Sequence, residues 1–189
     1  MQSPTRTSGL TYEDWMRRPE TNRIEELLDG ELVVSPAASF RHQRTVVNLV
    51  RAFDDHGRAT GDVVLPTPFD VVVDDRTVVQ PDVVYVRRER LPADPNARPF
   101  TVPPDLVVEV LSTNRAYDVV RKRRIFERHG IAEVWFVDVE ARRIEQVVLD
   151  DGRYRAPLVH EDGATVASTA VPGLTVAVTE ILPAEEDPR

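Results

Sequence analysis

A single acidic residue interrupts the most apolar stretch of this sequence. Glu109 lies within Asp105–Ser112, and the residues on either side of it are valine and leucine. An ionised carboxylate inside such a strand is costly unless it is paired, hydrogen-bonded or bound to a metal. The alternative is a glutamate at the strand end whose carboxylate reaches solvent. The apolar surroundings make Glu109 a candidate functional residue.

Lys122 is the only lysine among the 24 basic residues of the chain. Lysine differs from arginine in having a compact ammonium whose pKa the surroundings can shift. A helical wheel of residues 118–129 places Lys122 in the middle of the apolar face, which consists of Val119, Ile125, Phe126 and His129. A lysine that extends from the edge of this face into solvent is the alternative. An ammonium directed at a buried carboxylate would explain both Lys122 and Glu109.

Two Pro-Asp pairs compete to supply a second acid near Glu109. Asp105 lies four residues away in the same strand, which separates the two Cα atoms by about 13 Å. That distance is too long for a shared Mg²⁺, whose ligands lie at about 2.1 Å. Asp82 precedes a different apolar strand, Val83–Val86, which can pair with the first. The spacing favours Asp82 as the candidate and Asp105 as a structural turn residue.

Two carboxylates on adjacent strands and an ammonium from the next helix are typical of phosphodiesterase sites. The carboxylates hold a divalent cation, Mg²⁺ or Mn²⁺, which polarises the phosphate and activates water. The lysine positions the nucleophile or stabilises the developing negative charge. Asp82, Glu109 and Lys122 are therefore the predicted catalytic residues.

The same residues belong to a longer pattern: Glu26–Leu32, His42-Gln43, Gln80–Asp82, Asp105–Ser112, Tyr117-Asp118, Lys122 and Glu133–Asp138. With this pattern, the chain resembles the Uma family of bacterial endonucleases, part of the PD-(D/E)XK restriction-endonuclease-like superfamily. The resemblance covers about 11–149. It implies Asp82 and Glu109 as metal ligands, with the backbone carbonyl of Val110 as a further ligand. The chain departs from the superfamily pattern at Leu111, where a lysine is expected, and Lys122 on the following helix takes that role.

The resemblance also implies an α/β fold with an αβββαβ core, an N-terminal hairpin and a C-terminal strand extension. The core would comprise a helix over 40–56, strands near 62–73, 82–86 and 106–111, a helix over 116–129 and a strand over 133–137. A strand, a helix and a strand in succession from 105 to 137 independently favour a crossover unit in a partly parallel sheet.

Four further residues receive predicted roles with alternatives left open. Glu26 would add a metal ligand or be a solvated strand residue. His42 would contact phosphate, or cap or pack its helix. Arg115 and Arg121 would contact phosphates, because residues 115–128 carry a net charge of +4. Arg87, Arg88 and Arg90 form a second basic cluster, and ordinary solvated surface is the alternative for both clusters.

Apolar periodicity and turn residues predict the elements that position these side chains. The expected helices are Thr11–Arg18, Phe40–His56 with Ser39 as cap and Gly57 as stop, and Ala116–His129. The expected strands are Ile24–Leu28, Glu31–Ser35, Asp62–Leu65, Phe69–Val73, Val78–Val86, Asp105–Ser112 and Glu133–Val137. Short strands with glycine turns are expected from Arg142 to Leu182.

Length and composition restrict the class of protein. The 189 residues, with 41% hydrophobic and 30% charged residues, indicate one globular domain over 1–182 and a flexible acidic tail over 183–189. The absence of cysteine excludes disulfides, zinc knuckles and thiol nucleophiles. The polar N-terminus and the lack of a long apolar run predict no membrane segment and a cytoplasmic location. A net charge of −8 disfavours a wholly basic nucleic-acid-binding surface.

Together these features predict a Mg²⁺- or Mn²⁺-dependent DNA endonuclease, with DNA as the expected partner. A homodimer would suit the cutting of both strands, although nothing in the sequence decides this. The alternatives are a catalytically inactive nuclease-like module that binds nucleic acid or a protein, and a phosphohydrolase of small nucleotides.

Overall fold

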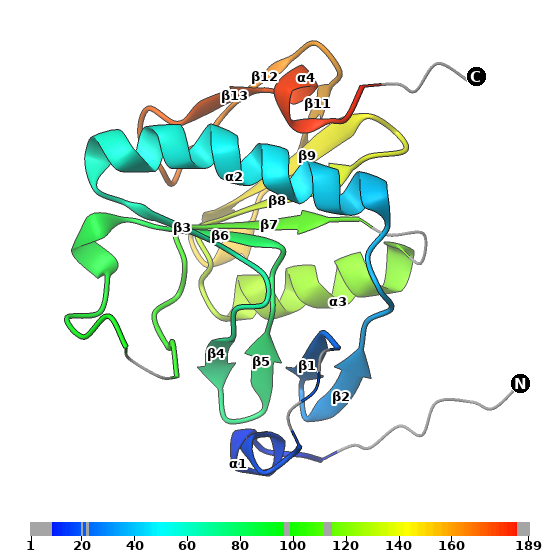
Figure 1. Cartoon of the computed structure of the whole chain (residues 1–189), viewed down its shortest axis with the longest axis vertical. Coiled ribbons are helices and arrows are strands. Elements are labelled where there is room, and N and C mark those ends of the chain that lie inside the picture. The colour runs from blue at the N-terminus through cyan, green and yellow to red at the C-terminus, as the bar shows by residue number, and fades with distance from the viewer. Residues whose placement is uncertain (1–8, 20, 22, 97–98, 112–114, 185–189) are drawn as a thin grey trace, which may run out of the picture.

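A large sheet with one long helix on each face organises the molecule (Figure 1). The computed structural model describes residues 9–19, 21, 23–96, 99–111 and 115–184. Helix α2 (Phe40–Thr60) lies along one face of the sheet, and α3 (Arg115–Arg128) lies along the other. A second, smaller sheet lies beyond α3, and the C-terminal elements lie beyond α2.

The large sheet has the strand order β10-β9-β8-β7-β6-β3, and β11 also pairs with β9. Its strands are β3 (Val63–Pro66), β6 (Val83–Val86), β7 (Leu106–Val110), β8 (Glu133–Asp138), β9 (Arg143–Asp150), β10 (Arg153–Tyr154) and β11 (Leu158–Glu161). Strands β7 and β8 are parallel, and the other neighbours are antiparallel. A parallel pair requires a crossover, and α3 supplies it, which confirms the predicted crossover unit.

The elements α2, β3, β6, β7, α3 and β8 follow one another in the predicted αβββαβ order. Every residue of β6, β7 and β8 is buried, because α2 and α3 cover both faces of these central strands. Such continuous burial explains why β7 has no polar alternation in its sequence apart from Glu109.

The small sheet was not predicted as a separate unit. It has the order β2-β1-β5-β4 and consists of β1 (Glu25–Leu28), β2 (Glu31–Val34), β4 (Val71–Asp74) and β5 (Thr77–Val79). The strand region predicted over 78–86, which Pro81 interrupts, forms two strands in different sheets, because β5 belongs to the small sheet and β6 to the large one. Pro81 lies between them and has no N–H with which to continue a ladder. Residues 80–82 thereby carry the chain from one sheet to the other.

Helix α2 begins as predicted but is longer. The side chain of Ser39 accepts a hydrogen bond from the backbone N–H of His42 at the first turn. Gly57 does not end the helix, which continues to Thr60 and ends at Gly61 in the left-handed conformation, with φ of 83°. A Cβ at Gly57 would lie 3.1 Å from the carbonyl oxygen of Asp62, so this glycine permits close packing.

The other two predicted helices are also present. Helix α1 (Tyr12–Met16) is shorter than expected and begins with a capping box between Thr11 and Asp14. Helix α3 agrees with its predicted range to within one residue at each end. A short 3₁₀ helix, Arg88–Arg90, follows β6.

The C-terminal elements partly extend the sheet and partly cover α2. Strands β12 (Thr165–Ala167) and β13 (Thr175–Ala177) form a hairpin-like pair of their own, followed by the short helix α4 (Val178–Ile181). Their apolar side chains share one core with α2 and the large sheet. Helix α4 was not predicted, because its β-branched residues resemble a strand. The chain beyond residue 184 lies outside the described residues, so the predicted tail remains a prediction.

Glu133 at the start of β8 is a fully buried carboxylate with its own set of donors. Its oxygens accept hydrogen bonds from the side chains of Trp135, Gln146 and Ser168 and from the backbone N–H groups of residues 169 and 170. A carboxylate with this many donors is a stable structural anchor. It fastens the loop before β13 to the end of the central sheet.

We expect Glu133→Gln to lower the free energy of unfolding by about 1–3 kcal/mol. The NH₂ group of glutamine cannot accept hydrogen bonds, so the donors that face it would lose their acceptor. Urea denaturation monitored by circular dichroism measures this change. The exposed Glu140→Gln serves as the matched control and should change stability little. Equal stability of the two variants would contradict the assigned role of Glu133.

Candidate active site

Asp82 and Glu109 lie directly across from each other on neighbouring strands. The antiparallel register of β6 and β7 pairs Val83 with Val108, which brings the preceding Asp82 opposite Glu109. The two residues are only 8% and 7% exposed. The Oδ2 of Asp82 accepts a hydrogen bond of 2.8 Å from the backbone N–H of Val110. Asp82 is therefore fixed to the carboxyl end of the strand that carries Glu109.

Lys122 points from α3 toward this pair of acids. Its Nζ lies 3.0 and 2.9 Å from the two carboxylate oxygens of Glu109. The apolar face predicted for α3 is present, since Ile125 and Phe126 beside Lys122 are each 1% exposed. The alternative of a lysine extending into solvent is wrong, because the Lys122 side chain is 14% exposed and doubly paired.

Glu26 of β1 is the second partner of Lys122. The Oε1 of Glu26 lies 3.0 Å from Lys122 Nζ and accepts a 2.9 Å hydrogen bond from the backbone N–H of Gln80. Glu26 is 2% exposed, so the alternative of a solvated strand residue is wrong. The sequence pattern did not reveal the contribution of Gln80, although this residue directly precedes the Pro81-Asp82 pair.

His42 reaches the site from the first turn of α2. Its Nε2 lies 3.4 Å from Asp82 Oδ2. Burial opposes a charge on the imidazole, but the hydrogen bond and the Coulomb attraction of Asp82 outweigh it and raise the pKa of His42. The capping alternative is wrong for the side chain, because Ser39 caps this helix. A phosphate contact by His42 remains a prediction.

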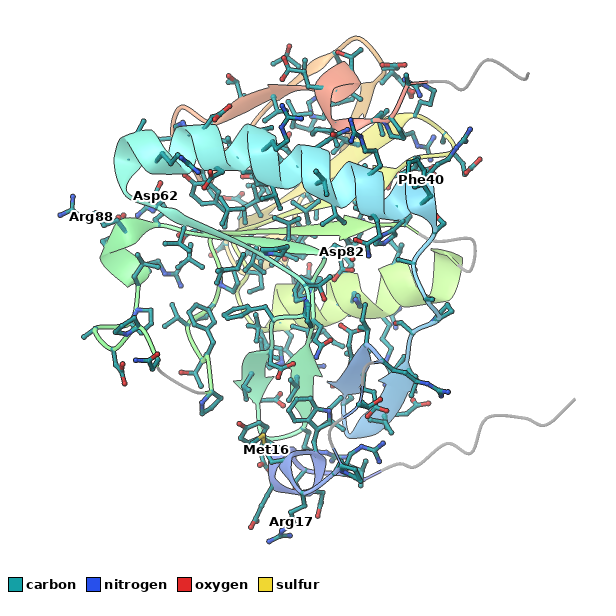
Figure 2. All side chains as sticks on the ribbon, viewed as in Figure 1. Met16, Arg17, Phe40, Asp62, Asp82 and Arg88 are labelled. Carbon is teal, nitrogen blue, oxygen red and sulfur yellow. The ribbon has the colours of Figure 1, made fainter. Side chains whose placement is uncertain are left out.

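Asp82 lies at one end of the large sheet, the end at which α2 begins (Figure 2). Asp62 and Arg88, which neighbour the opposite end of α2, appear far from it in this view. The residues that directly follow β7, Ser112 to Asn114, lie outside the described part of the chain. The site is therefore built at the carboxyl end of β7, between the start of α2 and the middle of α3.

The charges of the site do not balance among themselves. Burial raises the pKa of Glu109 to about 8, and Asp82 and Glu26 add to this shift while Lys122 opposes it. For Lys122, the carboxylates of Glu109, Glu26 and Asp82 outweigh burial and raise the pKa. Three buried acids thus share one ammonium, which stays charged.

This imbalance predicts a pH dependence of stability for the protein in EDTA. Folded Glu109 keeps its proton to a higher pH than the unfolded chain does, so the folded state binds more protons between about 4.5 and about 8. The free energy of unfolding contributed by Glu109 therefore falls as the pH rises through this window. The raised pKa of His42 acts in the same direction.

Urea denaturation of the wild type and of Glu109→Gln between pH 5 and pH 8 measures this contribution. The stability of the wild type relative to the variant should decrease as the pH rises, because glutamine does not titrate. A pH-independent difference between the two proteins would contradict the raised pKa of Glu109.

The donor atoms of the site fit a hard divalent cation. With all three acids ionised, Asp82, Glu109 and Glu26 with Lys122 would carry a formal charge of −2 in a buried region, and a divalent cation would neutralise it. Within the described residues, no three side chains of His, Cys, Asp or Glu could hold a metal ion by themselves. Mg²⁺ is commonly held by one or two carboxylates and keeps several waters. An arrangement of two acids with a backbone carbonyl fits that preference.

The predicted phosphate-contacting arginines have other partners or are not described. The guanidinium of Arg121 lies 3.0 Å from Glu31 and donates to the carbonyl of Leu28, and its side chain is only 16% exposed. Arg121 lies outside the predicted apolar face of α3, yet these contacts hold it against the small sheet and not in solvent. Arg115 begins α3, but its side chain lies outside the described residues.

Asp105 has the structural role that the spacing favoured. It accepts hydrogen bonds from the backbone N–H of Arg87 and from the Arg90 guanidinium. Two members of the second basic cluster are therefore tied to an internal acid. Their charge is offset within the protein.

The fold and the site together define the class of protein. An αβββαβ core with paired acids on two adjacent central strands is a restriction-endonuclease-like fold. Residues 11–179 match the family model described as "Uma2: Putative restriction endonuclease", and the chain belongs to this family.

A solved structure supports the same fold. The crystal structure of a protein described as a "putative nuclease belonging to DUF820" from Anabaena variabilis ATCC 29413 matches with a TM-score of 0.80 and 18% sequence identity. The match covers 92% of this chain and 97% of that one. None of the curated proteins matches this chain. Among the described residues, no helix is long and apolar enough to cross a membrane.

Proposed function

We propose that this chain is a Mg²⁺- or Mn²⁺-dependent DNA endonuclease, with Asp82, Glu109 and Lys122 as its catalytic residues. The proposal is supported chiefly by the convergence of these three buried side chains: Lys122 of α3 donates to both carboxylate oxygens of Glu109 in β7, and Asp82, directly before β6, accepts from the backbone N–H of Val110 next to Glu109. Membership of the family described as a restriction endonuclease supports nucleic acid as the substrate.

Asp82 and Glu109 would hold the cation, together with the backbone carbonyl of Val110. When bound, such an ion polarises a phosphate and lowers the pKa of a bound water. Glu109 would release its proton on loading, because metal ligands bind in the deprotonated form. The hydrogen bond from Val110 N–H orients Asp82 for this role.

Lys122 would stabilise the negative charge that develops on the phosphate oxygens during hydrolysis. A preorganised ammonium is effective in a site of low solvent content, since little reorganisation is needed as the charge develops. Glu26 would act on Lys122, since its carboxylate lies 3.0 Å from Nζ, rather than as a metal ligand. His42 would hold Asp82 through the Nε2 contact.

Cleavage of supercoiled plasmid by the purified protein tests this function. With Mn²⁺ we expect nicked and linear products, and with excess EDTA we expect none. Glu109→Gln, in which the charge of one proposed ligand is lost, should be inactive with Mn²⁺. The absence of cleavage with every divalent cation tried, by a protein that is folded by circular dichroism, would contradict the proposal.

The same assay separates the alternatives. Salt-dependent DNA binding without cleavage would identify an inactive nuclease-like module. Hydrolysis of free nucleotides with intact plasmid would identify a phosphohydrolase of small nucleotides. Sedimentation in the presence of duplex DNA would test the predicted homodimer.

A further inference from the structure

The first half of α2 carries positive charge, and the two acids of this helix, Asp54 and Asp55, follow in its second half, where Asp54 pairs with Arg58. Residues 40–53 include three arginines and neither aspartate nor glutamate, although the whole chain has a net charge of −8. Arg44 and Arg51 are exposed and make no hydrogen bond or ion pair with any residue that the structure describes. The third, Arg41, lies 3.8 Å from the exposed Glu140. The guanidinium groups of Arg44 and Arg51 are therefore available to a partner.

These arginines belong to a continuous stripe on the solvent side of the helix. Phe40, Arg44, Val47 and Arg51 follow the spacing of one helical face. Phe40 is 76% exposed and Val47 is 47% exposed. We refer to these four residues as the α2 face. Arg44 and Arg51 are about 10 Å apart along the helix, so the two side chains can reach different phosphates of one DNA strand.

The α2 face starts at the end of α2 that borders the active site, and it points to the opposite side of the helix from His42. His42, in the first turn of the same helix, lies 3.4 Å from Asp82. Figure 2 shows Phe40 and Asp82 toward the same end of the molecule. A DNA strand that enters the site near Asp82 would therefore pass the start of α2.

The arginines of α3 are less suited to this role. Arg121 is paired with Glu31, Arg123 donates to the carbonyl of Arg155, and Arg128 pairs with Asp29. Arg124 is exposed and unpaired among the described residues, but it lies in the last turns of α3, near the carbonyl end of the helix. The negative end of a helix dipole opposes a phosphate there.

We propose that the α2 face binds the phosphate backbone of duplex DNA next to the active site, with Arg44 and Arg51 as the principal contacts. This inference rests on the proposed function and names the surface that holds its substrate. Charge complementarity favours DNA over a symmetric dimer formed through this face, because two copies of a basic face repel each other. Phe40 and Val47 would contact the sugars beside the phosphates.

Fluorescence anisotropy with a labelled 20-base-pair duplex tests the proposal in the full chain. The parent carries Glu109→Gln and is measured in EDTA, so that no cleavage occurs. We expect Arg44→Ala/Arg51→Ala to weaken binding about tenfold at 50 mM salt and to reduce the slope of log K against log[salt] by about 2, or 0.9 for each lost contact. The matched control Arg124→Ala/Arg153→Ala removes the same charge and should change the affinity less than twofold.

Each outcome separates this inference from the proposed function. The inference is overturned if the α2 double variant binds DNA as tightly as the parent, or if both double variants weaken binding equally. Either result overturns it even when the wild type cleaves plasmid. A dimer that dissociates in the α2 double variant, with DNA affinity unchanged, assigns the face to a second copy and also overturns it. If the parent binds no duplex and the wild type cleaves no plasmid, the proposed function fails as well.

Discussion

Replacing Lys122 by methionine is expected to abolish cleavage and to destabilise the protein. The variant keeps the length of the side chain but removes the ammonium from between Glu109 and Glu26. Two buried carboxylates would lose their shared partner, which lowers the free energy of unfolding by about 3–5 kcal/mol. Plasmid cleavage with Mn²⁺ should fall at least about 1,000-fold, since several kcal/mol of transition-state stabilisation are lost.

A second variant separates the loss of activity from the loss of stability. Adding Glu26→Gln to Lys122→Met removes one of the orphaned charges, so part of the stability should return. Cleavage should stay absent, because no ammonium faces the phosphate. Recovery of cleavage together with stability would show that Lys122 is a structural residue only. Arg124→Met, two residues further along the same helix but exposed, is the control for the substitution itself.

Asp82→Asn is expected to lower Mn²⁺-dependent cleavage at least about 1,000-fold while leaving the protein folded. An asparagine oxygen can still accept the hydrogen bond from Val110 N–H, so the local structure persists. The charge that would hold the cation is lost, however, and with it several kcal/mol of metal-assisted catalysis. Initial rates of plasmid nicking over a series of Mn²⁺ concentrations measure the change.

Asp105→Asn is the matched control, because Asp105 also follows a proline and is also buried. Its loss should weaken the contacts with Arg87 and Arg90 and so reduce stability, without a specific effect on cleavage. If Asp105→Asn abolished cleavage while Asp82→Asn did not, the assignment of the two Pro-Asp pairs would be reversed.

The local sequence pattern predicted the residues that the site would need. Glu109 in an apolar strand and Lys122 on the apolar face of a helix are visible because both break a local periodicity. The structure brings them to within 3.0 Å of each other. The distance along the strand from Asp105 to Glu109 excluded Asp105 as a second acid of the site and left Asp82. The structure agrees with this choice, because the rise per residue of a strand is constant.

Prediction from local sequence patterns was wrong where the structural partner of a residue lies far along the chain. The strand predicted over 78–86 is divided between two sheets, because ladder pairing depends on which strands meet. Arg121 has the spacing of a solvent-facing residue, yet it is held by the loop and strand around Glu31. Glycine commonly ends helices, yet Gly57 lies inside α2. Its lack of a side chain is explained by the close approach of the Asp62 backbone.

Periodicity and chain length, which are local properties, predicted the crossover unit over 105–137 and the three central residues of the site, and the resemblance to the Uma family implied the αβββαβ core. The tertiary structure alone decided that Glu26 holds Lys122, that His42 touches Asp82 and that Arg44 and Arg51 of α2 have no partner among the described residues. These contacts join residues tens of positions apart, and their geometry depends on how two sheets and two helices pack. Spacing along the chain carries no information about such packing.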